Sequence, residues 1–402
     1  MARKYDKDFL GSVDKSFDSS KSFYKLDLLC KLIRMTIILV MTFSLVMTFS
    51  IVLYGCSGQE QKSQETTSQI EKPVEKEEKT TESAEKPGEK ITEMQITGNI
   101  NILSGLPISE EIKNLRPFAI MIENSPDARP QSGLNLADVV IEVVDEGGIT
   151  RYVVIYSSHE AEIVGPVRSA RQYYAEFARG FDPIYVFWGT YPECYKIIED
   201  TGLDVLSVLG DQTGNSSITA QASYWRDNSR VAPHNGYMSI LQLKEDAKRL
   251  GYSLEGGQSP LKFKLDAPLS ERGDISDISI DFSTAQFLAN FKYDKENNNY
   301  LKFVGGSPQT DREKGEQLKV NNIIAMITDI EGPIDAAGHM AARTTGVGKA
   351  FYFMDGKVIE GSWERTSIFD PFTYKDAEGN LVLFNRGSTW IAVVQSIDRI
   401  KY

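Results

Sequence analysis

The sequence has few of the residues that usually carry covalent or metal chemistry. It holds three cysteines and three histidines in 402 residues, and the HExxH, GxSxG, CxxC and Gly-rich phosphate-loop motifs are missing. We therefore expect no cofactor and no metal site, and the sequence favours a binding protein over an enzyme. A zinc site built from His159, His234 and His339 is an alternative, but their wide spacing favours separate structural or surface histidines.

Cysteine usage also excludes a disulfide framework. Cys194 is the only thiol after Cys56, so the main body of the chain cannot form an internal disulfide. The residues around Cys194 have the pattern of the first turn of an amphipathic helix. This pattern predicts a buried structural thiol rather than a nucleophile.

A surplus of basic residues is missing as well. The net charge is −12, and residues 91–402 carry all of it, with 30 Lys/Arg against 42 Asp/Glu. Nucleic-acid binding requires a basic surface that neutralises phosphates, so the acidic body argues against a nucleic-acid partner. Only one long uncharged run is present, which excludes a protein with several membrane spans.

That run, Met35–Leu53, identifies the N-terminal quarter as an export segment. Basic residues precede the run and hold its start in the cytoplasm, so the rest of the chain is predicted to be exported. The run is followed by Tyr54-Gly55-Cys56, and Leu53–Cys56 resembles the lipobox of bacterial lipoproteins, in which the chain is cut before an acylated cysteine. The sequence thus predicts a lipoprotein signal peptide over residues 1–55, with a long basic n-region, and a lipid such as palmitate on Cys56. An uncleaved single-span anchor is the alternative, and both predictions place the body on the extracytoplasmic face of the cell membrane.

A polar spacer separates this anchor from the folded body. The segment Ser57–Lys90 has no aromatic residue and few aliphatic ones, so it cannot bury enough apolar surface to offset its ordering entropy. We predict that residues 56–97 are a lipid-bearing, disordered spacer.

The body is predicted to have an α+β, or mixed α/β, fold in two parts. Residues 98–257 alternate strand-like runs with helical ones, which predicts a layered mixed α/β domain. The strands are expected at Pro117–Ile122, Asp138–Val144, Ile149–Tyr156 and Ile184–Trp188, and the helices at Arg168–Arg179, Pro192–Asp200 and Met238–Leu250. Residues 275–402 contain mostly strand-like runs, which predicts a mainly β domain. Its clearest feature is a hairpin, in which Asp355-Gly356 forms a type I′ turn between Ala350–Met354 and Lys357–Glu364.

Charged residues gather at the predicted ends of strands and helices. Glu142, Asp145, Glu146 and Arg151 flank a double glycine, and Arg168 and Arg171 lie where a helix begins and its free N–H groups can receive an anion. Arg230, His234 and Asn235 follow in a later loop. The sharper hypothesis is a cleft for an anionic or sugar-containing ligand of the cell envelope. The plainer one is that these arginines pair with Glu142, Asp145 or Asp227 and fix the internal geometry.

Several longer motifs lie between residues 100 and 400: Arg116–Asn124, Ala128–Leu134, Glu146–Arg151, Gly165–Arg171, Ala232–Asn235, Thr345–Ala350, Asp355–Trp363 and Gly387–Ile391. In sequence and in order they resemble the YerB family of bacterial lipoproteins. The resemblance implies a lipid-anchored protein of two domains, typical of Gram-positive bacteria, without an established activity. The motifs also mark Arg116 and Ser169. The candidate ligand-binding residues are then Arg116, Glu142, Glu146, Arg151, Arg168, Ser169, Arg171, Arg230, His234 and Asn235.

We expect a binding or accessory protein of the cell envelope with an anionic or saccharide wall ligand. One alternative is a wall-polymer hydrolase or transferase that uses the Arg/Glu/His cluster. Another is a structural partner of wall-synthesis proteins, which requires a large exposed apolar patch, for example around Trp363 and Trp390.

Overall fold

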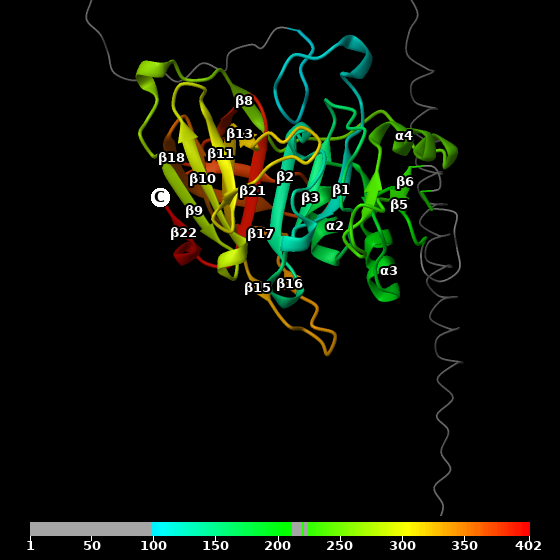
Figure 1. Ribbon diagram of the computed structural model, residues 1–402. Helices are drawn as coiled ribbons and strands as arrows, with labels where there is room; N and C mark the ends of the chain where they lie inside the picture. The colour runs from blue at the N-terminus through cyan, green and yellow to red at the C-terminus, as the bar shows by residue number, and fades with distance from the viewer. Residues whose placement is uncertain (1–97, 211–218, 221–222) are drawn as a thin grey trace, which may run out of the picture. The chain divides into compact units, whose positions relative to one another are not determined.

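The computed structural model describes residues 98–210, 219–220 and 223–402 (Figure 1). The predicted signal segment, Cys56 and the spacer all lie outside the described residues. Within the described part of the chain, no helix has both the length and the apolar character that crossing a membrane requires.

A mixed sheet of ten strands forms the centre of the described structure. Its strand order is β19-β18-β17-β14-β21-β2-β3-β1-β4-β5. The five strands from the earlier part of the chain are β1 (Phe118–Glu123), β2 (Val139–Val144), β3 (Thr150–Tyr156), β4 (Ile184–Phe187) and β5 (Val205–Ser207). The five from the later part are β14 (Asn322–Ile327), β17 (Gly346–Met354), β18 (Lys357–Arg365), β19 (Thr373–Asp376) and β21 (Thr389–Val394).

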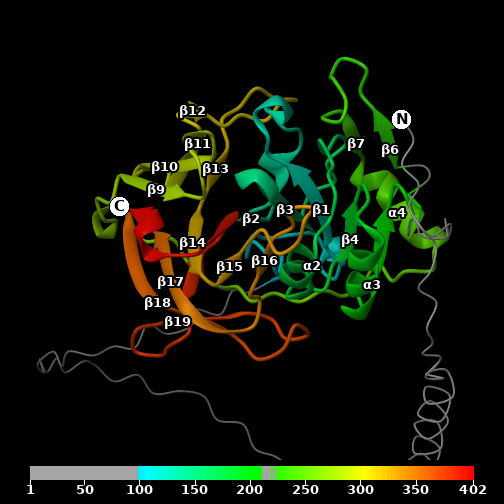
Figure 2. The ribbon, with the colours of Figure 1, turned by 90° about the horizontal axis from the view of Figure 1, so that it is seen from below.

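The two parts of the chain meet inside this sheet. β21 lies between β14 and β2 and runs parallel to both, with Val139 opposite Thr389 and Val143 opposite Val393. Figure 1 shows this junction as the red strand beside the green-cyan one, and Figure 2 shows the early strands and the late strands on either side of it. Every residue of β2 and β21 is buried, as expected for strands covered on both faces.

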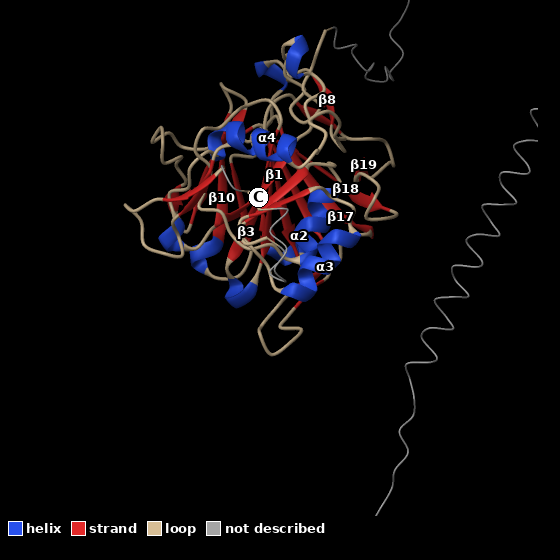
Figure 3. Ribbon diagram, turned by 90° about the vertical axis from the view of Figure 1, so that its right-hand side faces the viewer, coloured by secondary structure: helices blue, strands red, loops and turns tan. Residues whose placement is uncertain are grey.

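Helices and a second sheet cover the two faces of the central sheet. On one face, α2 (Gln172–Arg179) and α3 (Pro192–Asp200) pack against residues such as Met121 and Val153. On the other face, α4 (Ile240–Arg249) packs near Ile120. The helices therefore lie on opposite sides of the strands (Figure 3).

The second sheet shares the face that α4 covers. It consists of β9 (Asp277–Asp281), β10 (Leu288–Asp294), β11 (Asn299–Val304), β12 (Ser307–Pro308), β13 (Lys319–Val320) and β22 (Ile400–Lys401). Phe291 of this sheet packs edge to face on Trp390 of β21, with ring centroids 6.1 Å apart. The small pairs that complete the described structure are β6 (Tyr224–Arg226) with β7 (Gly236–Met238), β8 (Lys262–Lys264) with β20 (Leu383–Asn385), and β15 (Ile330–Glu331) with β16 (Ala341–Ala342).

The predicted fold class is confirmed, and the hairpin at Asp355-Gly356 has the predicted turn. Met354 pairs with Lys357, and both turn residues have positive φ, 54° for Asp355 and 64° for Gly356. The helix predicted from Arg168 begins only at Gln172. The preceding residues are extended because the Arg168 N–H bonds to the Met121 carbonyl and the Ala170 N–H to that of Gly189.

The prediction of an exposed apolar patch around Trp363 and Trp390 is wrong. Both indoles are buried, and each N–H has an internal acceptor: the Ile327 carbonyl for Trp363 at 2.8 Å, and Glu142 Oε2 for Trp390 at 3.0 Å. The Trp390 ring packs against Tyr152 and Phe291, and the Trp363 ring against Phe372 and Arg343, so both indoles belong to the core. Cys194 is also buried, and burial raises the pKa of its thiol, as expected for a structural cysteine.

Candidate functional site

The candidate residues gather at one edge of the central sheet. β1 and β2 both pair antiparallel with β3, so their last residues lie at the same edge as the first residues of β3. Four segments meet there: the loop after β1, the turn between β2 and β3, the extended segment Gly165–Arg171, and the loop between β6 and β7.

Strand register separates the charged residues onto two faces. Arg151 lies opposite Glu123 on β1 and Val143 on β2, whereas Glu142 lies opposite Tyr152. Because side chains alternate along a strand, Glu142 points to the face covered by the second sheet, away from Arg151. Three local environments result.

Glu142 belongs to a buried pair between the two sheets. Its side chain and that of Lys302 on β11 are both fully buried, with Lys302 Nζ 4.0 Å from Glu142 Oε2. Thr150 and Trp390 donate hydrogen bonds to the same carboxylate. Burial raises the pKa of Glu142, although the Lys302 charge opposes this, and burial lowers the pKa of Lys302 to about 8. We call these two residues the inter-sheet pair.

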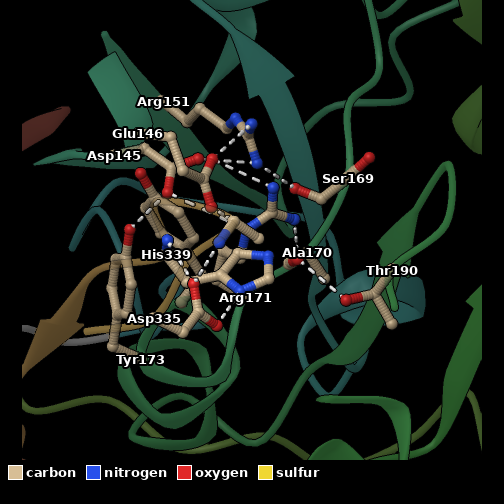
Figure 4. A network of polar contacts seen from close by, with 12 residues as sticks. Asp145, Glu146, Arg151, Ser169, Ala170, Arg171, Tyr173, Thr190, Asp335 and His339 are labelled. Carbon is tan, nitrogen blue, oxygen red and sulfur yellow. Dashed lines mark hydrogen bonds and ion pairs between the residues drawn. The ribbon is translucent and has the colours of Figure 1, made fainter. Parts of the chain in front are cut away.

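Glu146, Arg151 and Arg171 form a network with Asp145 and Tyr173, which we call the closed cluster (Figure 4). Arg151 Nη1 lies 2.7 Å from Asp145 Oδ2 and Nη2 lies 3.2 Å from Glu146 Oε2. Arg171 donates to both oxygens of Glu146, at 2.5 and 3.0 Å. The Tyr173 hydroxyl donates to Asp145 Oδ1 at 2.8 Å. In this cluster each arginine is neutralised by a carboxylate.

A loop from the later part of the chain extends this network. The His339 ring stacks on Tyr191 with centroids 4.2 Å apart, and the Arg171 guanidinium lies 5.9 Å from the centre of the same tyrosine ring. His339 Nδ1 in turn contacts Asp335 at 2.6 Å. The loop between β15 and β16 therefore lies against the network that holds Arg171 (Figure 4).

Arg168 and His234 belong to a third group, together with Glu123 and Ser125, which we call the open cluster. His234 Nδ1 lies 3.0 Å from Glu123 Oε2 and 3.3 Å from Ser125 Oγ. Ser125 donates to the other carboxylate oxygen, Glu123 Oε1, at 2.9 Å. Arg168 reaches Glu123 Oε2 only through Nε, at 3.7 Å.

Three side chains of the open cluster have unused hydrogen-bonding capacity. Among the described residues, the two Nη groups of Arg168 and Nε2 of His234 have no partner. The buried Glu123 Oε2 accepts no aligned hydrogen bond, a feature that it shares with Asp145 Oδ2 of the closed cluster. The Arg168 side chain is 31% exposed and that of His234 is 19% exposed, so both remain in reach of solvent. The open cluster thus contains groups that a bound molecule could satisfy.

His234 lines a groove of about 570 Å³ that also involves Asp127 and Arg230. Arg230 donates to the backbone carbonyls of Asp127, Arg129 and Pro130 and to the Tyr237 hydroxyl, at 2.9 to 3.2 Å. No carboxylate in the described part of the chain pairs with Arg230. It fastens the loop that carries His234 to the loop after β1 and adds positive charge beside the groove.

The remaining candidates have local roles. Arg116 lies at the opposite end of β1, where it pairs with Asp204 at 2.5 Å, so it is remote from the other candidates. Asn235 accepts a hydrogen bond from Arg226 at 2.6 Å within the β6–β7 hairpin. Ser169 contributes its backbone carbonyl, which accepts from Arg151 at 3.0 Å. Sequence reasoning missed Glu123 and Ser125, although the polar run that begins at the last residue of β1, Glu123–Ser125, could have indicated them.

The three histidines do not converge. His159 contacts Ser158, His234 contacts Glu123 and His339 contacts Asp335. No group of three or more His, Cys, Asp or Glu side chains within the described ranges is arranged to hold a metal ion.

The architecture and motifs identify a class of protein built from two consecutive domains of unknown function. Residues 103–253 match the N-terminal domain of DUF3048, a protein family of unknown function, and residues 278–391 match its C-terminal domain. The chain is 33% identical over 298 residues to the protein named "Putative lipoprotein YerB" of Bacillus subtilis, covering 74% of this chain and 86% of that protein. The crystal structure of the B. subtilis YerB protein matches with a TM-score of 0.66 at 32% identity, over 75% of this chain and 98% of that one. The chain belongs to the YerB-like family.

Proposed function

We propose that this protein is a lipid-anchored binding protein on the outer face of the cell membrane, which holds an anionic ligand of the cell envelope at the open cluster. Two features support the anchor: the uncharged run Met35–Leu53, which is followed by Tyr54-Gly55-Cys56, and the lipoprotein name of the Bacillus relative. A diacylglyceryl cysteine carries enough methylenes for stable anchoring, at about 0.8 kcal/mol for each one buried.

Labelling with a clickable palmitate analogue in a bacterial host tests the anchor. We expect the wild-type chain to be labelled and Cys56→Ala to lose the label. Cys30→Ala is the control, because Cys30 precedes the predicted cleavage site and its loss should leave the label unchanged. Label that persists in Cys56→Ala would overturn the anchor.

The Arg168 guanidinium, whose two Nη groups have no partner among the described residues, is the observation that carries the binding proposal. A guanidinium presents a planar fork of N–H donors that matches a carboxylate or a phosphate, and an Arg that has not used this fork in the folded protein retains it for a ligand. The body as a whole is acidic, so an anion is repelled by the average surface. Arg168, together with Arg230, supplies the local positive charge that such a ligand requires.

Binding of poly(glycerol phosphate) to the full chain in detergent micelles tests this site, with neutral dextran as the comparison polymer. We expect saturable binding of the phosphate polymer, weakening as salt is added, and a loss of at least about tenfold in Arg168→Ala, which corresponds to about 1.4 kcal/mol. Arg399→Ala is a matched control, because Arg399 is 30% exposed and pairs with Asp281 on the second sheet. Equal binding by Arg168→Ala and wild type would refute the proposed site.

A further inference from the structure

We propose that the protein hydrolyses carboxylic ester groups on the ligand held at the open cluster, and that His234 is the general base in this reaction. This inference rests on the proposed function, because the anion bound by Arg168 is taken as the molecule that carries the ester. It assigns a reaction to the groove beside His234.

The orientation of the His234 ring is the first observation. Its Nδ1 faces Glu123 Oε2 at 3.0 Å, while Nε2 has no partner in the described structure and the ring lines the groove. A carboxylate beside Nδ1 favours the tautomer that carries the proton there, which leaves the Nε2 lone pair free to accept a proton. The contact is not an aligned hydrogen bond, and such contacts often tighten only when the substrate is bound.

Ser125 has a positioning role in this arrangement. It contacts the same ring nitrogen that faces Glu123, at 3.3 Å, and donates to Glu123 Oε1 at 2.9 Å. A serine nucleophile would have to lie beside the free nitrogen, Nε2, which takes up its proton. Ser125 is therefore not the nucleophile, and the proposal gives that role to a water molecule activated by Nε2; Ser125 holds the carboxylate that orients the ring.

Arg168 supplies the positive charge that the reaction requires. It contacts the same carboxylate oxygen as His234, so a ligand in contact with one can reach the other. Its free Nη donors can stabilise the negative charge that develops on the carbonyl oxygen when water attacks. This combination of one base and one cation is the minimum for acyl hydrolysis.

A single imidazole favours a carboxylic ester over a phosphate diester. In the ester, the attacking and leaving oxygens are both attached to one tetrahedral carbon, so the same Nε2 can serve both. In-line displacement at phosphorus places the two oxygens on opposite sides, where one imidazole cannot reach both. The geometry therefore selects acyl groups esterified to hydroxyls of an anionic polymer.

The reaction balances without a further reactant. Water forms a bond to the carbonyl carbon as Nε2 takes its proton, and the carbonyl oxygen becomes an oxyanion beside Arg168. Collapse of this intermediate breaks the ester C–O bond, and the leaving alkoxide takes the proton back from Nε2. The products are the free alcohol and a carboxylic acid, which loses its proton to solvent.

Release of acetate from O-acetylated poly(glycerol phosphate) by the full chain in detergent, followed by NMR, tests the reaction. We expect release by the wild type and a rate at least about 100-fold lower in His234→Gln, since general base catalysis contributes about that much or more. His159→Gln is the matched control, because His159 contacts Ser158 and should have no influence on release. Wild-type release no faster than that of His234→Gln would overturn the inference.

A second variant and a binding measurement separate the inference from the proposed function. Glu123→Gln should slow release at saturating polymer and leave polymer binding undiminished, because the carboxylate orients the His234 ring and is not itself a donor to the anion. A merely structural role of Glu123 would weaken polymer binding as well, and release as fast as that of the wild type would contradict the assignment. Normal polymer binding by wild type and His234→Gln without any release would overturn catalysis alone, whereas undiminished binding by Arg168→Ala would overturn the binding site as well.

Discussion

The closed and open clusters both combine arginine with carboxylates at the same edge of one sheet, yet they differ in what their charges contact. In the closed cluster, Asp145 is fully buried, and Arg151 and Arg171 each reach a carboxylate at 2.7 Å or less. In the open cluster, Arg168 touches its carboxylate only through Nε at 3.7 Å, and His234 uses one of its two ring nitrogens. Charged residues at a strand end are therefore a weak sign of a ligand site. Donors and acceptors that the fold leaves unused are a stronger one.

The largest difference between the clusters should appear when one arginine is removed from each. Arg151→Ala leaves the buried Asp145 with only a distant cation, Arg171 Nε at 3.9 Å. We expect the free energy of unfolding to fall by at least about 3 kcal/mol, because a buried charge that has lost its partner is strongly destabilising. Urea unfolding followed by circular dichroism measures the change. A loss below about 1 kcal/mol would show that Asp145 does not depend on this pairing.

The inter-sheet pair, Glu142 and Lys302, is as fully buried as Asp145 in the closed cluster but lies at the other face of the sheet. Because Lys302 titrates at an unusual pH there, this pair can be tested by changing the pH. Burial lowers the pKa of Lys302 from its usual 10.5 to about 8 in the folded protein. In this window Lys302 binds more protons in the unfolded chain than in the folded protein, so this group adds to the free energy of unfolding as the pH rises from about 8 towards 10. Below that window the folded protein must hold a buried ammonium group, and part of the stability is lost.

Urea unfolding at several pH values between about 8 and 10 checks this slope. We expect the wild type to gain stability relative to Lys302→Met over this range, because the variant lacks the titrating group while retaining an apolar side chain of similar length. Cys194 and buried tyrosines such as Tyr152, whose pKa burial raises, lower the free energy of unfolding with rising pH in both proteins alike, so the difference between the two slopes is the readout. Identical slopes for the two proteins would contradict the assignment to Lys302.

The smallest effect on stability is expected in the open cluster. Arg168→Ala removes a contact of 3.7 Å at a partly exposed position, so the free energy of unfolding should change by less than about 1 kcal/mol. The same urea series that includes Arg151→Ala supplies the measurement. If Arg168→Ala were as destabilising as Arg151→Ala, the guanidinium would be a structural element, and the distinction between the two clusters would disappear.

Much of the fold was predictable because it depends on local patterns. The runs that became β1, β2, β3 and β4 are short, rich in Val, Ile and aromatic residues, and bounded by turn residues, and Asp355-Gly356 specifies its turn directly. The insertion of β21 between β14 and β2 was not predictable in this way. It joins residues about 250 positions apart, such as Glu142 and Trp390, and no local pattern encodes such a pairing.

The candidate site was predictable in composition and not in arrangement. Strand-end positions and family motifs marked Arg168, Arg171 and His234, and the structure places all three at one edge of the sheet. Glu142 was grouped with Arg151 because they are close in sequence, but the alternation of side chains along a strand places them on opposite faces. Glu123 was missed because its role depends on Arg168 and His234, which reach it from two distant loops.

By itself, the sequence determined the division of the chain into an uncharged run ending at Cys56, a polar spacer and an acidic α+β body, because composition and short-range periodicity are properties of neighbouring residues. It also determined membership in the YerB-like family. Only the tertiary structure decided which charges are neutralised and which remain available. The reason is physical: the partner of a charged side chain depends on strand register, on the face of the sheet and on loops that meet across long separations. A linear pattern specifies none of these.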